Sequence, residues 1–151
     1  MKKKRILRMI VLVLLLVAVL IQFIPVDRSV PDVDPSKDLL AMHEAPSGVV
    51  NILKDACYDC HSHKTRYPWY SYIAPVSMWL QGHVDHGKEH LNFSEWGDYD
   101  ADRRDHKLEE IAEEVEEKYM PLNSYTWGHP DARLSDEQRA ELVAWVNTLR
   151  K

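Results

Sequence analysis

The chain has 151 residues, enough for one domain of ordinary size, and its 45% apolar content excludes disorder throughout. Residues 1–30 hold six Lys or Arg against one Asp, a net charge of +5, whereas residues 31–151 hold 13 Lys or Arg against 23 Asp or Glu, a net charge of −10. An acidic body repels phosphate backbones, so nucleic acid is not an expected partner, and two cysteines exclude a multi-disulfide framework.

An apolar run follows a basic cluster at the N-terminus. Residues 9–26 are apolar apart from Gln22 and Pro25, and 18 helical residues span about 27 Å, close to one hydrocarbon core. We therefore expect residues 1–26 to form a single-pass anchor that contacts the membrane through 9–26. The basic cluster stays on the cytoplasmic side, which places the rest of the chain outside. A cleaved signal peptide is the alternative, but no small-residue cleavage site follows the run.

Residues 27–46 have a different composition, in which prolines alternate with acids. Proline fixes the backbone and removes donors, and isolated acids favour solvation. This pattern predicts a solvated tether leading to a globular domain at 47–151. The prolines and acids concerned are Pro31, Pro35, Pro46, Asp27, Asp32, Asp34 and Asp38.

The globular part reads as a series of short helices. Apolar spacing predicts a helix over 48–57, capped by Ser47, that delivers Cys57 at its end. A second helix is expected to begin near Pro75, a favourable first helical position, and to end at 92–94. Its predicted apolar face comprises Val76, Trp79, Leu80, His83, Val84 and Leu91.

Two further helices complete the domain. The third, over about 104–118, is surrounded by glutamates that indicate a solvated face. The last begins at a capping box, in which Ser135 and Gln138 satisfy each other's backbone donors. No segment alternates with period two, so the fold class is all-α. The apolar stripe of the third helix is Leu108, Ile111, Val115 and Tyr119, and that of the last is Leu142, Val143, Trp145, Val146 and Leu149.

The motif Cys57-x-x-Cys60-His61 carries the chemistry of the chain. Two thiols three positions apart can each add to one vinyl group of a haem, and the next residue, His61, can then bind the iron. A zinc site with His61 and His63 is an alternative, although structural zinc usually takes two ligand pairs. A redox dithiol normally lies at a helix N-terminus, whereas this motif follows a helix. A structural disulfide is the remaining alternative.

The second axial position of a haem needs its own candidate. Met120, next to Pro121 and ahead of the capped last helix, would supply a soft thioether that favours Fe(II). His83, on the predicted apolar face of the second helix, is the alternative distal ligand.

Sequence blocks beyond this motif are also distinctive. Cys57-x-x-Cys60-His61-Ser62 precedes Thr65-x-Tyr67-Pro68-Trp69-Tyr70, His83-x-x-x-Gly87-Lys88 and Leu91-Asn92-Phe93-Ser94-x-Trp96. Over about residues 46–150 these blocks resemble the haem-binding domain family of exported bacterial proteins. Met120-Pro121 with Leu134-Ser135-x-x-Gln138 also resembles the end of a class I cytochrome c. The resemblance implies a small cytochrome c-like helical domain with one haem c held by Cys57 and Cys60, His61 as proximal ligand and Met120 as distal ligand.

These observations favour a membrane-anchored electron carrier in the bacterial cytoplasmic membrane, with its domain in the periplasm and a redox partner that the sequence does not identify. Aromatic residues would wall the haem and lower the polarity around it. A peroxidase or gas sensor with an open sixth position, using His83, is the second hypothesis. A zinc-binding interaction module is the third. The expected wall residues are Tyr67, Trp69, Tyr70 and Trp79.

Overall fold

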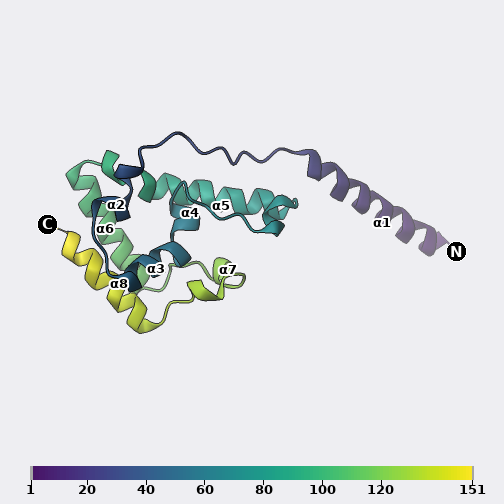
Figure 1. The fold of residues 1–151 in the computed structure, drawn as a ribbon. Helices are drawn as coiled ribbons and strands as arrows, with labels where there is room; N and C mark the ends of the chain where they lie inside the picture. Colours follow the sequence, from purple (N-terminus) through teal and green to yellow (C-terminus); the bar gives the residue numbers. More distant parts are fainter. Residues whose placement is uncertain (1, 151) are drawn as a thin grey trace. The chain divides into compact units, whose positions relative to one another are not determined.

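The computed structural model describes residues 2–150, and its regular structure is helical, with no strand among these residues (Figure 1). The predicted all-α class is therefore confirmed. The α-helices are α1 (Lys2–Leu20), α2 (Leu39–Met42), α3 (Ser47–Ala56), α4 (Tyr58–His61), α5 (Val76–His90), α6 (Ala101–Glu116), α7 (Asn123–Thr126) and α8 (Asp136–Leu149). The 3₁₀ turns are η1 (Ile21–Phe23), η2 (Pro35–Lys37), η3 (Trp69–Tyr72), η4 (Phe93–Asp98) and η5 (Pro130–Ala132).

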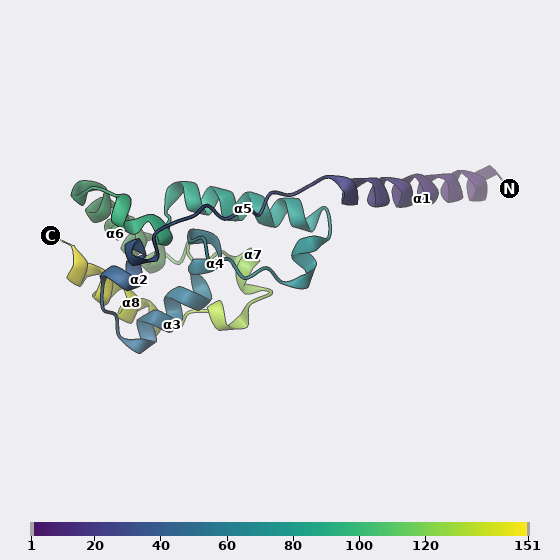
Figure 2. The ribbon, with the colours of Figure 1, turned by 45° about the horizontal axis from the view of Figure 1, so that its top comes forward.

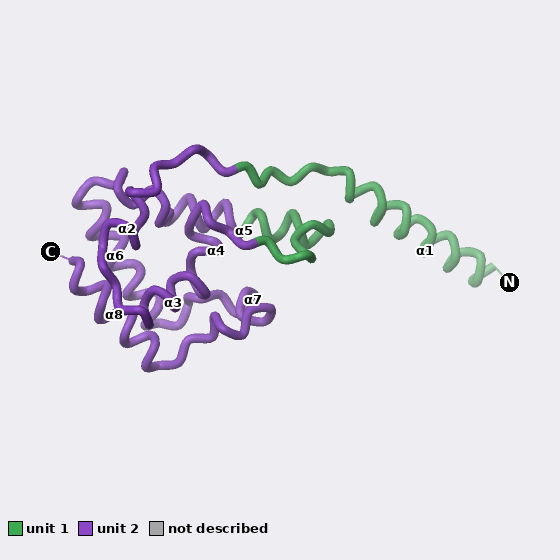
Figure 3. The backbone as a smooth tube through the Cα atoms, in the orientation of Figure 1, with its two compact units in different colours: residues 1–29, 67–83 green, residues 30–66, 84–151 purple. Residues whose placement is uncertain are grey.

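The chain divides into two compact units (Figure 3). The first, called here the anchor unit, comprises residues 1–29 and 67–83, and the second, the motif unit, comprises 30–66 and 84–151. Helix α5 contributes its first half to the anchor unit and its second half to the motif unit.

The core of the motif unit forms where α8 packs against both α6 and α3, as Figures 1 and 2 show. Removing these apolar side chains from water is the main stabilising contribution to this unit. Its most deeply buried side chains are Leu39, Val49, Leu53, Phe93, Trp96, Leu142 and Val146.

The helix ends test the predicted caps. The capping box of Ser135 and Gln138 is present at the start of α8, as predicted. The predicted cap at Ser47 is wrong, because Ser47 is itself the first residue of α3 and makes no capping bond. Helix α6 begins three residues earlier than expected, where the Asp100 side chain accepts a hydrogen bond from the Arg103 amide at 2.8 Å.

Tyr119 is not part of the buried stripe of α6. The helix ends at Glu116, so Tyr119 lies beyond it and is 66% exposed, while Ala112 takes the buried position instead. The glutamates of α6 surround a narrow buried stripe, in agreement with a solvated face.

The acid-and-proline segment is not solvated along its whole length. From residue 35 onward it folds into η2 and α2, and Leu39 enters the core of the motif unit. Asp38, expected to be solvated, is 2% exposed because its side chain caps α2 and accepts further hydrogen bonds.

In the anchor unit, α1 is long and apolar enough to cross a membrane, and the candidate span runs over Lys2–Phe23 with no part of it buried in the protein. Helix α5 begins at Val76, one residue after Pro75. Its predicted apolar face is only partly buried: Val84 is 2% exposed, whereas Val76 is 40% and Trp79 is 53% exposed.

Candidate functional site

The cysteine motif folds as a tight helical turn at the end of α3. Cys57 ends α3, its carbonyl accepts hydrogen bonds from the amides of Cys60 and His61, and α4 follows directly. Cys60 and His61 both lie against α5, because a Cβ on Gly87 would meet the Cys60 carbonyl and the His61 ring contacts the Gly87 carbonyl. Cys57, whose backbone is not helical, directly precedes this turn.

Both cysteines are free and partly buried. Burial raises the pKa of the Cys57 thiol to about 12 and that of the Cys60 thiol to about 11, with smaller contributions from the neighbouring Cys60 and Asp59. Both groups are therefore protonated thiols at neutral pH. A redox dithiol requires a lowered thiol pKa, so the dithiol alternative does not fit. The disulfide alternative is also at odds with the two free thiols.

The His61 ring is fixed by two backbone carbonyls. Its Nδ1 lies 2.9 Å from the Gly87 oxygen and 3.2 Å from the Leu91 oxygen. Carbonyl oxygens only accept, so Nδ1 carries the proton and donates it, which leaves the lone pair on Nε2. Burial lowers the pKa of His61 and keeps the ring neutral. A neutral imidazole held in this tautomer is the form that binds a metal through Nε2.

Gly87 allows α5 to approach the motif this closely. A Cβ placed on Gly87 would lie 2.7 Å from the carbonyl oxygen of Cys60 and 3.3 Å from the Cys60 Cβ. The contact is with backbone, which cannot move aside as a flexible side chain can. The missing side chain therefore brings the Gly87 carbonyl within reach of His61.

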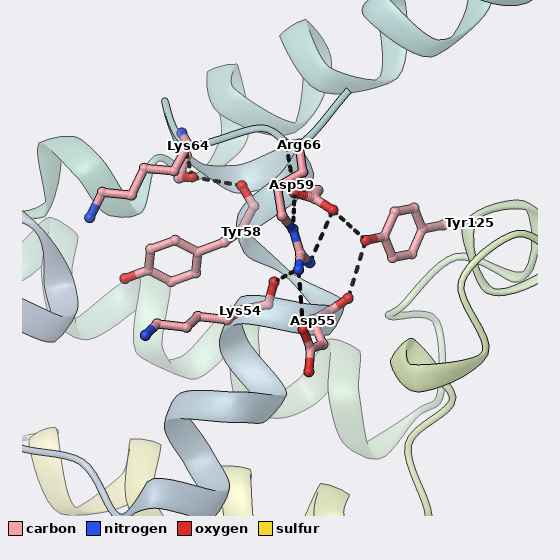
Figure 4. Close-up of polar contacts among 8 residues, drawn as sticks. Lys54, Asp55, Tyr58, Asp59, Lys64, Arg66 and Tyr125 are labelled. Atoms are coloured by element: carbon pink, nitrogen blue, oxygen red, sulfur yellow. Dashed lines mark hydrogen bonds and ion pairs between the residues drawn. The ribbon is translucent and has the colours of Figure 1, made fainter. Parts of the chain in front are cut away.

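Asp59, the residue before Cys60, is hydrogen-bonded to side chains of other segments (Figure 4). Asp59 is 5% exposed and accepts hydrogen bonds from the Arg66 amide at 2.9 Å, the Arg66 Nε at 3.2 Å and the Tyr125 hydroxyl at 2.7 Å. Burial, followed by the hydrogen bond to Asp59, raises the pKa of Tyr125. Because Tyr125 belongs to α7, this bond joins the motif to the chain between α6 and α8.

Tyr58, the other intervening residue, is held by a second buried carboxylate. Its hydroxyl donates to Asp38 at 2.8 Å, and the Lys64 ammonium lies 2.8 Å from the other oxygen of the same carboxylate. The Tyr58 ring stacks on the Phe93 ring with centroids 5.0 Å apart. The Phe93 ring also makes an edge-to-face contact with the His61 ring, with centroids 6.3 Å apart.

A cavity of about 510 Å³ lies beside Tyr58 and Asp59. Cys57, Cys60 and His61 do not line it. Its lining residues are Asp38, Leu40, Ala41, Val50, Lys54, Tyr58, Asp59, Lys64 and Arg66.

Met120 lies in the motif unit, on the segment between α6 and α7. Its amide donates to the Glu114 carbonyl at 3.0 Å, and its carbonyl accepts from Arg139 of α8 at 2.6 Å. The side chain is half-buried. The backbone at Met120 is therefore fixed to both α6 and α8, five residues ahead of the Tyr125 contact.

The remaining predicted site residues belong to the anchor unit. The Tyr67 hydroxyl donates to Gln81 at 2.9 Å, Trp69 meets Tyr70 edge-on, and the Trp79 ring packs on His83 with centroids 4.4 Å apart. The His83 Nδ1 lies 2.9 Å from the Trp79 carbonyl. Their roles as haem wall and alternative ligand stay predictions.

The zinc alternative lacks a ligand set in the part of the chain that the structure describes. No group of three or more His, Cys, Asp or Glu side chains there could hold a metal ion. The Nε2 of His63 lies 2.7 Å from Glu95 and 2.9 Å from Asn92, which ties the segment after the motif to η4.

Comparison with known families decides the class of protein. Residues 16–148 match a family described as a haem-binding domain. The chain belongs to the haem-binding domain family. No curated protein and no solved structure gives a significant match. The donor set of this haem-binding domain fits its cofactor, because two free thiols and a neutral imidazole whose Nε2 keeps its lone pair lie within five consecutive residues.

Several residues that shape this haem-binding domain's site were not given a role from the sequence. In the sequence, Gly87 was noted only as part of a block that resembles the family. A glycine inside a predicted helix is a signal that another segment approaches its backbone closely, and this signal could have identified Gly87. Asp59 and Asp38 gave no signal, since a buried acid looks like a solvated one until its partners are known.

Replacing Gly87 by Ala tests the close approach. We expect Gly87→Ala to lower the free energy of unfolding by about 1–2 kcal/mol, because overpacking against the Cys60 backbone exceeds the gain in helix propensity. Chemical denaturation measures the change. Gly82→Ala in the same helix is the matched control: a Cβ there meets no atom within 4 Å, so it should leave stability unchanged or raise it. Equal effects of the two substitutions would contradict the role of Gly87.

Replacing Asp59 tests the anchoring of the motif. Asp59→Ala should destabilise the domain by about 1–3 kcal/mol, because the Tyr125 hydroxyl and the Arg66 amide lose their acceptor. Asp55→Ala removes the other, exposed carboxylate partner of Arg66, at 3.4 Å, and should cost about 0–1 kcal/mol. Thermal unfolding compares the two, and a larger loss for Asp55→Ala would refute the assignment.

Proposed function

We propose that this haem-binding domain carries one haem c and transfers electrons outside the cytoplasmic membrane, to which α1 anchors it. The observation that carries the proposal is the His61 geometry: Nδ1 donates to the carbonyls of Gly87 and Leu91, so Nε2 keeps the lone pair, and two free thiols precede this histidine in the same motif. When bound, the haem supplies a one-electron Fe(II)/Fe(III) couple.

Attachment uses the two cysteines. Cys57 and Cys60 would hold the haem through thioether bonds, each formed if an S–H added across one vinyl C=C bond, with sulfur on one carbon and hydrogen on the other and no net oxidation. His61 supplies the proximal nitrogen, and its backbone partners hold the ring plane and the tautomer through changes of oxidation state.

Met120 is our proposed distal ligand. It belongs to the same unit as His61, its backbone is fixed by Arg139, and the following α7 docks on Asp59 of the motif. A thioether opposite an imidazole raises the reduction potential relative to two imidazoles, which suits an electron carrier. This pair of ligands is the one that the resemblance to the end of a class I cytochrome c implies.

Membrane anchoring is supported by the candidate span over Lys2–Phe23. The basic residues at its start favour the cytoplasmic side, and this orientation would put the motif unit in the periplasm. Haem c is attached outside the cytoplasmic membrane in this scheme, on the same side as Cys57 and Cys60.

Removing both thiols tests covalent attachment. The protein matured with haem-attachment machinery should show haem absorbance that survives denaturation as a thioether-linked pyridine adduct. Cys57→Ala with Cys60→Ala should abolish this covalent signal, because no other cysteine remains. His106→Ala, on the exposed side of α6, is the control and should leave it intact. Covalent haem in the double variant would overturn the proposal.

Substituting Met120 tests the distal ligand. Met120→Leu keeps the volume and removes the sulfur, so we expect a spectral change of the iron and a lower reduction potential. Spectroelectrochemistry measures both. Met42→Leu is the matched control, since the Met42 sulfur lies near Gly97 in η4 and should have no influence on the iron. An unchanged spectrum in Met120→Leu together with an altered one in His83→Ala would transfer the distal role to His83.

A further inference from the structure

The anchor unit carries an exposed apolar surface beside the end of α1. Residues 67–84 contain no Asp, Glu, Lys or Arg in a chain in which 28% of residues are charged. Within this segment six large apolar or aromatic side chains are exposed, of which Met78, at 37%, is the least exposed. The other five we call the aromatic patch: Trp69 at 75%, Tyr72 at 62%, Ile73 at 47%, Val76 at 40% and Trp79 at 53%.

The local geometry groups these side chains in pairs. Trp69 and Tyr72 lie three residues apart in the 3₁₀ turn η3, where such positions eclipse each other. Val76 and Trp79 lie three residues apart on one face of α5. Exposed apolar side chains gathered in this way indicate a binding surface rather than scattered surface residues.

Gln22 fixes this segment to the end of the candidate span. Its side-chain amide makes two hydrogen bonds with Ala74, donating to the Ala74 carbonyl at 3.0 Å and accepting from the Ala74 amide at 3.0 Å. Gln22 is the second-last residue of the span over Lys2–Phe23. Ala74 therefore lies at the level where α1 and η1 leave the hydrocarbon.

Arg28 makes a second connection. Its guanidinium donates to the Ser71 carbonyl and lies over the rings of Tyr72 and Tyr67, with its carbon 4.7 Å and 5.3 Å from the ring centroids. The segment is thus attached both to the end of the span and to the residues that follow it. The aromatic patch cannot move far from that level without breaking these contacts.

We propose that the aromatic patch inserts into the outer interface of the lipid bilayer that α1 spans. Tryptophan and tyrosine favour the headgroup region, where the ring is partly apolar and the polar tip stays hydrated. The absence of Asp, Glu, Lys and Arg over 67–84 lowers the desolvation cost of insertion. The inference rests on the proposed membrane anchoring, and it gives Trp69 and Trp79 a lipid contact in place of the haem wall expected from the sequence.

Photolabelling in nanodiscs tests this surface. The full-length haem-loaded chain is placed in phosphatidylethanolamine–phosphatidylglycerol nanodiscs that contain phospholipids with a photoreactive diazirine, either in the acyl chain or close to the headgroup. Trypsin then releases three diagnostic peptides, 9–28, 67–88 and 119–133, whose labelling is measured by mass spectrometry. Peptide 119–133 is the matched control, because it contains Trp127, which is 80% exposed, and Tyr119, which is 66% exposed.

The three peptides separate this inference from the anchoring on which it rests. We expect the acyl-chain probe to label 9–28, and the headgroup probe to label 67–88 several-fold more than 119–133. If the acyl-chain probe labels 9–28 but the headgroup probe labels 67–88 and 119–133 equally, the proposed insertion of the aromatic patch is overturned and the membrane anchoring by α1 is retained. No labelling of 9–28 would overturn the anchor and the patch with it.

A double variant distinguishes lipid contact from a haem wall. Trp69→Ser with Trp79→Ser should reduce labelling of 67–88 and leave the haem spectrum and the labelling of 9–28 unchanged. Trp127→Ser should change none of these. A double variant with an altered haem spectrum and unchanged labelling would overturn the proposal in favour of the haem wall.

Discussion

The orientation of the His61 ring is the constraint on which the site depends. Two carbonyls of one helix end accept the Nδ1 proton, so the ring has a single tautomer and a single direction. That arrangement needs α5 to lie against the motif, and α5 can do so because Gly87 has no side chain to meet the Cys60 backbone. Gly87 lowers the helix propensity of α5 at its position, but its missing side chain allows the contact that fixes the His61 imidazole in the tautomer able to bind a metal.

The two residues between the cysteines, Tyr58 and Asp59, show how a short turn is made rigid. A four-residue helix has too few internal hydrogen bonds to hold its own geometry. Asp59 and Asp38 compensate, each as a buried carboxylate that accepts from groups on other segments. Through Tyr125 the same network reaches the segment that carries Met120, so both proposed axial ligands belong to one connected structure in the motif unit.

Local sequence signals predicted most of the helices well. The capping box at Ser135 and the all-α class were right because each depends on contacts within a few residues. Errors arose where distant contacts decide the outcome. Asp38 was expected in water but is buried among partners from other segments. Tyr119 is a local error, because it was expected on the apolar stripe of a helix that ends at Glu116. Trp79 was expected on a buried face, but helical periodicity alone does not reveal what covers a face.

By itself, the sequence determined that the chain is helical, begins with an apolar run, and places Cys57, Cys60 and His61 on one turn, because spacing along a helix fixes which side chains share a face. Only the tertiary structure decided which nitrogen of His61 is free, which acids are buried, and which aromatic side chains stay exposed. Those properties depend on contacts between carbonyls, hydroxyls and backbone of segments far apart in the chain, and a local sequence pattern does not specify such long-range contacts.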